Sequence, residues 1–137
     1  MLADPVAGLG SVAPELDYLV LTVPLDDDTR HLVNADVLDA MKPTAFLVNL
    51  ARGAVVETGA LVDALQRGSI AGAGLDAFEE EPLPPDSPLW DLDNVAITAH
   101  MGGRSERYVE LVLEVFEPNL RRFLDGRLDA LTNVVAR

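Results

Sequence analysis

The 137-residue sequence contains no cysteine and only two histidines, and these shortages exclude whole classes of site. Without cysteine there is no disulfide framework, no thiolate nucleophile and no cysteine-based zinc site. Ten Lys and Arg against 23 Asp and Glu give a net charge of −13, which disfavours binding to nucleic-acid phosphates and to anionic membranes. No apolar run approaches the roughly 18 residues of a membrane-spanning helix, and no signal-peptide pattern opens the chain. We therefore expect a soluble cytoplasmic protein with no metal site, no nucleic-acid partner and no membrane partner.

What the sequence does contain is a set of short apolar runs that alternate with helix-like patterns. Near-continuous apolar runs of this length are typical of strands buried in a parallel sheet. They predict strands over residues 18–23, 45–48, 70–75 and 94–98. Asn34 is positioned to cap a short helix that ends near Met41, and Thr58 to cap a helix that ends before Gly68. A long apolar stripe at helical spacing predicts a further helix from about Tyr108 to Leu124.

Strands that alternate with helices predict an α/β fold, a Rossmann-like parallel sheet with flanking helices. We divide the chain into a linker (1–15), βα units (16–103) and a C-terminal helix with its tail (104–137). In such sheets, ligands bind beyond the carboxyl ends of the strands.

Polar residues follow several of these predicted strands. Arg52 lies in the segment Asn-Leu-Ala-Arg-Gly after the second strand, and its planar guanidinium suits a carboxylate held by two parallel hydrogen bonds. Asp76 follows the third strand, and His100 follows the fourth. Glu81 stands before Pro82 in the loop between those two strands. We expect Arg52, Glu81 and His100 to face one crevice.

At this point the sequence resembles the D-isomer-specific 2-hydroxyacid dehydrogenases, which include phosphoglycerate, glyoxylate and hydroxypyruvate reductases. The segment from Met41 to Glu57 is similar to the longest signature of that family, and Leu16–Asn34 resembles an earlier one. The resemblance runs from about Asp4 to Val135. It implies an NAD(P)-dependent oxidoreductase that transfers a hydride between a nicotinamide and a small 2-keto or 2-hydroxy acid, with NAD favoured over NADP and a homodimer as the assembly.

The resemblance also implies roles for single residues. Arg52 would bind the substrate carboxylate, His100 would be the general acid and base, and Glu81 would accept a hydrogen bond from His100. Asp76 would orient the nicotinamide carboxamide. The expected cofactor contacts, which include Arg52 and His100 themselves, are completed by Thr22, Val23, Pro24, Leu50, Ala51, Gly102 and Gly103.

The sequence departs from the family pattern in two side chains and in length. Thr22 stands where His is frequent, and Ala99 replaces the proline that commonly precedes the catalytic histidine; neither change removes a reacting group. Complete members are more than twice as long and carry a strand–GxGxxG–helix segment upstream. The string from Gly8 to Ala13 has similar spacing, but no buried strand precedes it and Pro14 interrupts the following helix, so we reject it as that fingerprint.

The 137-residue chain is therefore expected to be the C-terminal part of such an enzyme, inactive alone and weak in NADH binding. Two alternatives stay open: a non-catalytic dimerising fragment, and a dehydrogenase-like regulator that senses NAD(H). Simpler roles are predicted for other residues. His31 is expected to be a solvated surface histidine, Trp90 a core anchor, and Glu79 and Glu80 solvated members of an acidic run.

Overall fold

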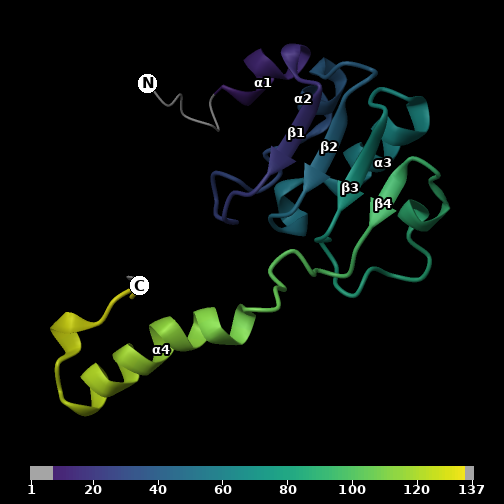
Figure 1. The fold of residues 1–137 in the computed structure, drawn as a ribbon. Helices are drawn as coiled ribbons and strands as arrows, with labels where there is room; N and C mark the ends of the chain where they lie inside the picture. The colour runs from purple at the N-terminus through teal and green to yellow at the C-terminus, as the bar shows by residue number, and fades with distance from the viewer. Residues whose placement is uncertain (1–7, 135–137) are drawn as a thin grey trace. The chain divides into compact units, whose positions relative to one another are not determined.

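The computed structural model describes residues 8–134, and the part up to Gly102 is built on a four-stranded sheet (Figure 1). The strands follow one another across the sheet in chain order, and every neighbouring pair is parallel. They are β1 (Tyr18–Leu21), β2 (Phe46–Asn49), β3 (Gly72–Leu75) and β4 (Val95–Ile97). All four arrowheads point to the same edge, so the loops that follow the strands gather there. The predicted Rossmann-like parallel sheet is confirmed.

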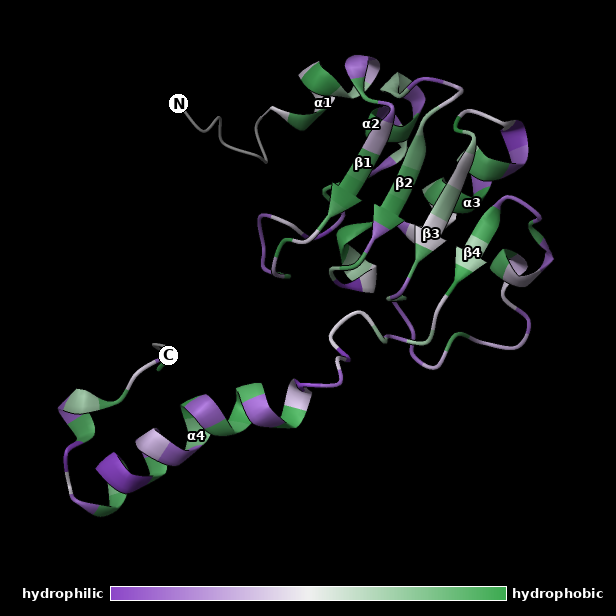
Figure 2. Ribbon diagram, in the orientation of Figure 1, coloured by the Kyte–Doolittle hydropathy of each residue, from purple (hydrophilic) through white to green (hydrophobic). Residues whose placement is uncertain are grey.

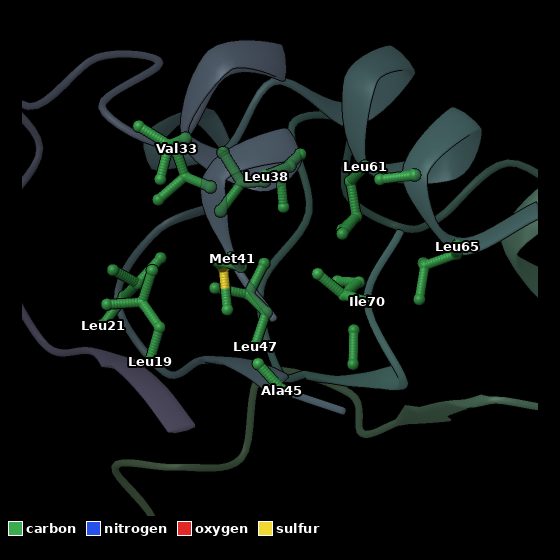
Figure 3. Packing of buried hydrophobic residues seen from close by; sticks show 14 of the residues in the cluster. Leu19, Leu21, Val33, Leu38, Met41, Ala45, Leu47, Leu61, Leu65 and Ile70 are labelled. Atoms are coloured by element: carbon green, nitrogen blue, oxygen red, sulfur yellow. The ribbon is translucent and has the colours of Figure 1, made fainter. Parts of the chain in front are cut away.

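Helices α2 (Ala35–Ala40) and α3 (Thr58–Arg67) pack together on one face of this sheet. Asn34 caps α2 as predicted, because its side chain accepts the Val37 N–H at 3.2 Å. Gly68 ends α3 in the left-handed conformation that glycine adopts most readily, with φ of +68°. Figure 3 shows the core between the two helices and the sheet, where Leu38 of α2 and Leu61 of α3 lie above Leu47 of β2.

The other face of the sheet is less covered. Along β1 and β2 the buried and less buried side chains alternate, as expected for strands that bury mainly one face. Tyr18 and Phe46 lie on the open side with their rings stacked 5.8 Å apart. In Figure 2 β3 is paler than β1 and β2 because glycine and alanine dominate it.

Two expectations about local structure need correction. Thr58 does not cap α3 with its side chain; Glu57 is the capping position and makes no side-chain bond, while Thr58 is the first helical residue. Residues 8–15, expected to belong to a linker, form α1 (Leu9–Val12) and a 3-10 turn, η1 (Ala13–Glu15), with Leu9 and Ala13 in the core. The rest of that expected linker lies outside the described residues.

The chain divides into two compact units, one up to Gly102 and one from Gly103. The second contains α4 (Tyr108–Leu124) and the turn η4 (Leu128–Ala130). Asn119 joins the helix to the following segment, because its side chain bonds both the carbonyl and the N–H of Thr132. Within residues 8–134, no helix is both long enough and apolar enough to cross a membrane.

Candidate active site at the carboxyl edge of the sheet

Arg52 lies in a loop shaped by the last residue of β2. Asn49 is buried, and its side-chain oxygen accepts the Ala51 N–H at 3.0 Å while its amide donates to the Arg52 carbonyl at 3.0 Å. This bonding satisfies a buried polar side chain and fixes the path of the loop. The Arg52 guanidinium is exposed, with one nitrogen donating to the Ala51 carbonyl at 2.7 Å. The other N–H groups of the guanidinium remain available, and the loop that carries Arg52 is held in place by Asn49.

Gly53 follows Arg52 and begins the short turn η2 (Gly53–Val55). A Cβ at Gly53 would lie 1.8 Å from the carbonyl carbon of Phe78 and 2.1 Å from the nitrogen of Glu79. The backbone of the loop after β3 therefore rests directly on the backbone of the Arg52 loop. Only glycine allows this approach.

His100 and Glu81 form a hydrogen-bonded pair at the same edge, which is an ion pair when the imidazole is protonated. The His100 Nδ1 lies 2.8 Å from one carboxylate oxygen of Glu81 and 3.0 Å from the other. Both side chains keep more than a third of their surface exposed, 43% for His100 and 38% for Glu81. His100 has a φ of +51°, an uncommon conformation outside glycine.

Glu81 is also held by the backbone of its own loop. The Phe78 N–H donates to Glu81 at 3.0 Å. That bond, and then the bond from His100, hold the pKa of Glu81 below its ordinary value of 4.5. The nearby Arg52 charge acts in the same direction. Because an ionised carboxylate can only accept, the proton of a neutral His100 lies on Nδ1, and Nε2 is the nitrogen that is left for other groups.

Asp76 organises the segment on both sides of His100. Its buried carboxylate accepts hydrogen bonds from the Thr98 hydroxyl, from the Met101 N–H at 2.8 Å and from the Gly102 N–H at 2.6 Å. The Thr98 bond, followed by the Met101 bond, holds the pKa of Asp76 below its ordinary value of 3.8, although burial acts in the opposite direction. Asp76 therefore fixes the turn that presents His100. Its predicted bond to a nicotinamide carboxamide stays a prediction.

The lowered pKa of Asp76 predicts how an Asp76→Asn variant unfolds. As the pH falls below about 5, the unfolded state takes up a proton before the folded state does, so the contribution of this carboxylate is full above its ordinary value of 3.8 and lost below it. Asp76→Asn should lower the free energy of unfolding at pH 7 by about 1–3 kcal/mol and flatten its decline between pH 5 and pH 3. Urea unfolding followed by circular dichroism measures both effects.

The exposed Asp63 on α3 provides the control. Asp63→Asn removes the same charge, and the side chain of Asp63 makes no hydrogen bond in the described part of the chain. Equal slopes against pH for the Asp63 and Asp76 variants would contradict the structural role of Asp76.

A cavity of about 260 Å³ lies beside the ion pair. Glu81 and His100 line it together with apolar side chains, among them Leu83 and Trp90. Trp90 was expected to anchor the core, and this is wrong: its residue is 52% exposed, and the indole N–H donates to the Pro84 carbonyl at 2.9 Å. In the turn η3 (Pro88–Asp91), Leu89 is the buried residue and the adjacent Trp90 is exposed.

The remaining expected cofactor contacts lie after the strands, at the edge that carries the ion pair. Thr22, Val23 and Pro24 follow β1, and Leu50 and Ala51 follow β2. Leu50 is 49% exposed and adjoins Gly102, because a Cβ added at Gly102 would lie 4.0 Å from the Leu50 side chain. Gly103 begins the second compact unit, and its cofactor contact stays a prediction.

These residues fit part of a nicotinamide dinucleotide. Exposed apolar side chains such as Leu50, beside backbone without a Cβ at Gly102, suit a planar ring that must lie close to the chain. A pyrophosphate needs a glycine loop between a strand and a helix. The string from Gly8 to Ala13 forms the four-residue α1 and the start of η1, so it does not lead into a long helix.

Two contacts of the site were not predicted from the sequence: the bond of Thr98 to Asp76 and the contact of His31 with Glu79. Thr98 stands two residues before His100, and the alternation of a strand would have placed both on one side of the chain. His31 is an exposed surface residue, as expected, but its Nε2 also lies 2.7 Å from Glu79, which was not predicted. Glu79 is exposed as expected, and its contact with His31 spans 48 residues, which no local pattern encodes.

Comparison with known proteins adds to this geometry. Residues 2–102 match the family model described as D-isomer specific 2-hydroxyacid dehydrogenase, NAD binding domain. Glyoxylate reductase of Pyrococcus furiosus is 47% identical over 120 residues, which are 88% of this chain and 35% of that protein. The chain spans about a third of the length of the curated relatives that it matches.

Solved structures are similar as well, and two of them illustrate the likeness. A D-isomer specific 2-hydroxyacid dehydrogenase from Xanthobacter autotrophicus, in complex with NADPH and MES, is 37% identical, with a TM-score of 0.79 over 95% of this chain and 52% of that one. An NADPH-dependent glyoxylate/hydroxypyruvate reductase from Sinorhizobium meliloti, in complex with NADP and malonate, is 40% identical, with a TM-score of 0.78 over 85% of this chain and 36% of that one. An NAD or NADP cofactor, as predicted, agrees with these relatives.

Proposed function

Because the chain belongs to the D-isomer specific 2-hydroxyacid dehydrogenase family, we propose that it supplies the proton-transfer and carboxylate-binding residues of an NAD(P)-dependent reductase of small 2-keto acids. The single observation that carries the proposal is the pairing of His100 with Glu81 at the carboxyl edge of the sheet. Arg52 follows β2 at the same edge. Glyoxylate and hydroxypyruvate are the first substrates to test, because similar proteins are named for them.

In this proposal His100 moves the proton. Its Nδ1 is engaged by Glu81, so Nε2 gives a proton to the keto oxygen during reduction and removes it from the hydroxyl in the reverse direction. The ionised Glu81 fixes the orientation of the ring, because it accepts the proton on Nδ1. The cavity beside the pair is lined mostly by apolar side chains.

Arg52 binds the substrate carboxylate. The bond to the Ala51 carbonyl uses one of its donors, and the others can form the paired hydrogen bonds that a carboxylate accepts. Leu50, Ala51 and Gly102 would hold the nicotinamide end of the cofactor, which when bound supplies the hydride. The preference for NAD, the homodimer and the cytoplasmic location remain predictions.

The test of this function is an activity assay in a full-length context. A chimera can join this chain to the upstream part of the Pyrococcus furiosus relative, which is 47% identical over 120 residues. We expect it to oxidise NADH or NADPH when glyoxylate or hydroxypyruvate is added, followed by the loss of reduced-nicotinamide absorbance. A folded chimera that binds the cofactor but reduces neither acid would contradict the proposal for these substrates.

Arg52→Lys tests the carboxylate site within the same chimera. Lysine keeps the charge but loses the planar pair of donors. Loss of one charge-assisted hydrogen bond, about 1.5–3 kcal/mol, should raise the KM for the keto acid roughly 10- to 100-fold. The KM for the cofactor should change far less. If Arg52→Lys left the KM for the keto acid within twofold of the parent, Arg52 would not be the carboxylate ligand.

A further inference from the structure

Glu79 joins three segments that lie far apart in the sequence. One of its carboxylate oxygens lies 2.7 Å from the His31 Nε2, and the other accepts the Thr58 N–H at 3.0 Å. Thr58 is the first residue of α3, so its N–H has no partner within the helix. We name this set of contacts the Glu79 bridge. It fastens the loop after β3 to the loop after β1 and to the start of α3.

Glu79 has the charge that such a bridge needs. Burial acts to raise its pKa, but the hydrogen bonds from Thr58 and His31 outweigh burial and lower the pKa below its ordinary value of 4.5. The carboxylate is thus ionised at neutral pH. Charge-assisted hydrogen bonds of this kind are stronger than neutral ones, and two of them act on a side chain that is only 33% exposed.

The bridge lies within two residues of Glu81. The Phe78–Glu79 backbone rests on Gly53, the Glu79 side chain is fastened to His31 and Thr58, and the Phe78 N–H bonds Glu81. The loop is therefore fixed immediately before Glu81, the residue that is paired with His100.

The other end of the bridge lies beside the Arg52 turn. The backbone N–H of His31 donates to the carbonyl of Ala54, within η2, at 2.8 Å. His31 has a φ of +51°, which this bonding supports. One residue thus holds the turn that follows Arg52 with its backbone and the loop that precedes Glu81 with its side chain.

We propose that Glu79, together with His31, is a positioning residue for the reaction proposed above, on which this inference rests. The Glu79 bridge holds residues 78–81 against η2, so that Glu81 stays bonded to His100 and keeps a fixed place relative to Arg52. Glu79 acts through Glu81. Loss of the bridge would leave the fold intact and loosen the ion pair.

Carbon-13 NMR titration of the Glu81 carboxyl group in the 137-residue chain tests this proposal without any substrate. Glu79→Ala should raise the pKa of Glu81 by about half a unit or more, because the bonds from Phe78 and His100 weaken. Loss of a neighbouring negative charge alone would lower that pKa, so the two explanations predict opposite signs.

Glu80→Ala is the matched control, since it removes the same charge from the adjacent residue. His31→Asn is the second variant: asparagine tolerates the left-handed backbone but cannot reach Glu79, and it leaves the Thr58 contact in place. We expect the pKa of Glu81 to rise in both bridge variants and not in Glu80→Ala. A Glu81 pKa that stays level with the Glu80→Ala control, or falls, in folded His31→Asn protein would overturn the proposal, even if Glu79→Ala failed to fold.

Activity separates this inference from the proposed function. In the chimera, Glu79→Ala should lower kcat about tenfold and leave the KM for the cofactor unchanged, because misplacement of a catalytic group slows the chemical step. Glu79→Gln, which keeps an acceptor for Thr58, should restore part of the rate. An inactive parent chimera would count against the proposed function alone, and the titration of Glu81 would still decide whether Glu79 positions it.

Discussion

His100→Asn should lower the rate of keto-acid reduction at pH 7 by about two to four orders of magnitude, the range that a positioned general acid contributes. Asparagine is the appropriate replacement because it tolerates the φ of +51° at this position and can still donate a hydrogen bond to Glu81. It cannot transfer a proton. The effect therefore reports the chemistry of the imidazole and not a disturbance of the loop. Steady-state kinetics of the chimera measure kcat.

Two controls belong to the His100→Asn experiment: the affinity for the cofactor, and a substitution far from the site. The Kd for NADH or NADPH, measured by calorimetry, should change by only a few-fold. Arg67→Ala is the control, since Arg67 lies at the last turn of α3 in an exposed ion pair with Asp39, and such pairs contribute little. A kcat for His100→Asn within fivefold of the parent would mean that another group supplies the proton.

Gly53→Ala should destabilise the chain by about 3 kcal/mol or more, because overpacked atoms here meet backbone that cannot turn aside. Three backbone atoms of Phe78 and Glu79 lie within 2.1 Å of the added Cβ. The loop that carries Glu81 would have to move away from η2. Urea unfolding followed by circular dichroism measures the loss.

Gly59→Ala provides a control with the opposite sign. Gly59 lies in the first turn of α3, and a Cβ added there has nothing within 4 Å. Alanine is the better helix former, so this change should stabilise the chain by about 0.5–1 kcal/mol. Equal effects of the two substitutions would contradict the close approach at Gly53.

The sequence patterns that predicted correctly are local ones. Apolar runs predicted all four strands, and Asn34 and Gly68 predicted helix ends, because each of these signals acts within a few residues. The order of polar residues after parallel strands also placed Arg52 and His100 at one edge. The pairing of His100 with Glu81 came from the resemblance to a family, and in the structure their side chains lie 2.8 Å apart.

Features that depend on contacts between distant segments could not be predicted in this way. The local pattern assigned the cap of α3 to Thr58, whereas its N–H is bonded by Glu79, 21 residues further along the chain. His31 has no motif around it, and its partner is 48 residues away. Trp90 was expected in the core on hydrophobicity alone, although the turn around it buries Leu89. In each of these cases the contacts depend on how the folded chain brings residues together, which a local sequence pattern does not contain.

The position of Trp90 has a practical consequence for optical work on this protein. It is the sole tryptophan, and it lies half-exposed in the wall of the cavity that holds His100 and Glu81. Intrinsic fluorescence of the chain is therefore a reporter of this wall rather than of the interior between the sheet and its helices. A small acid that enters the cavity should quench or shift the emission while the far-ultraviolet circular dichroism stays constant. Binding can therefore be followed by the fluorescence of Trp90 without an added label.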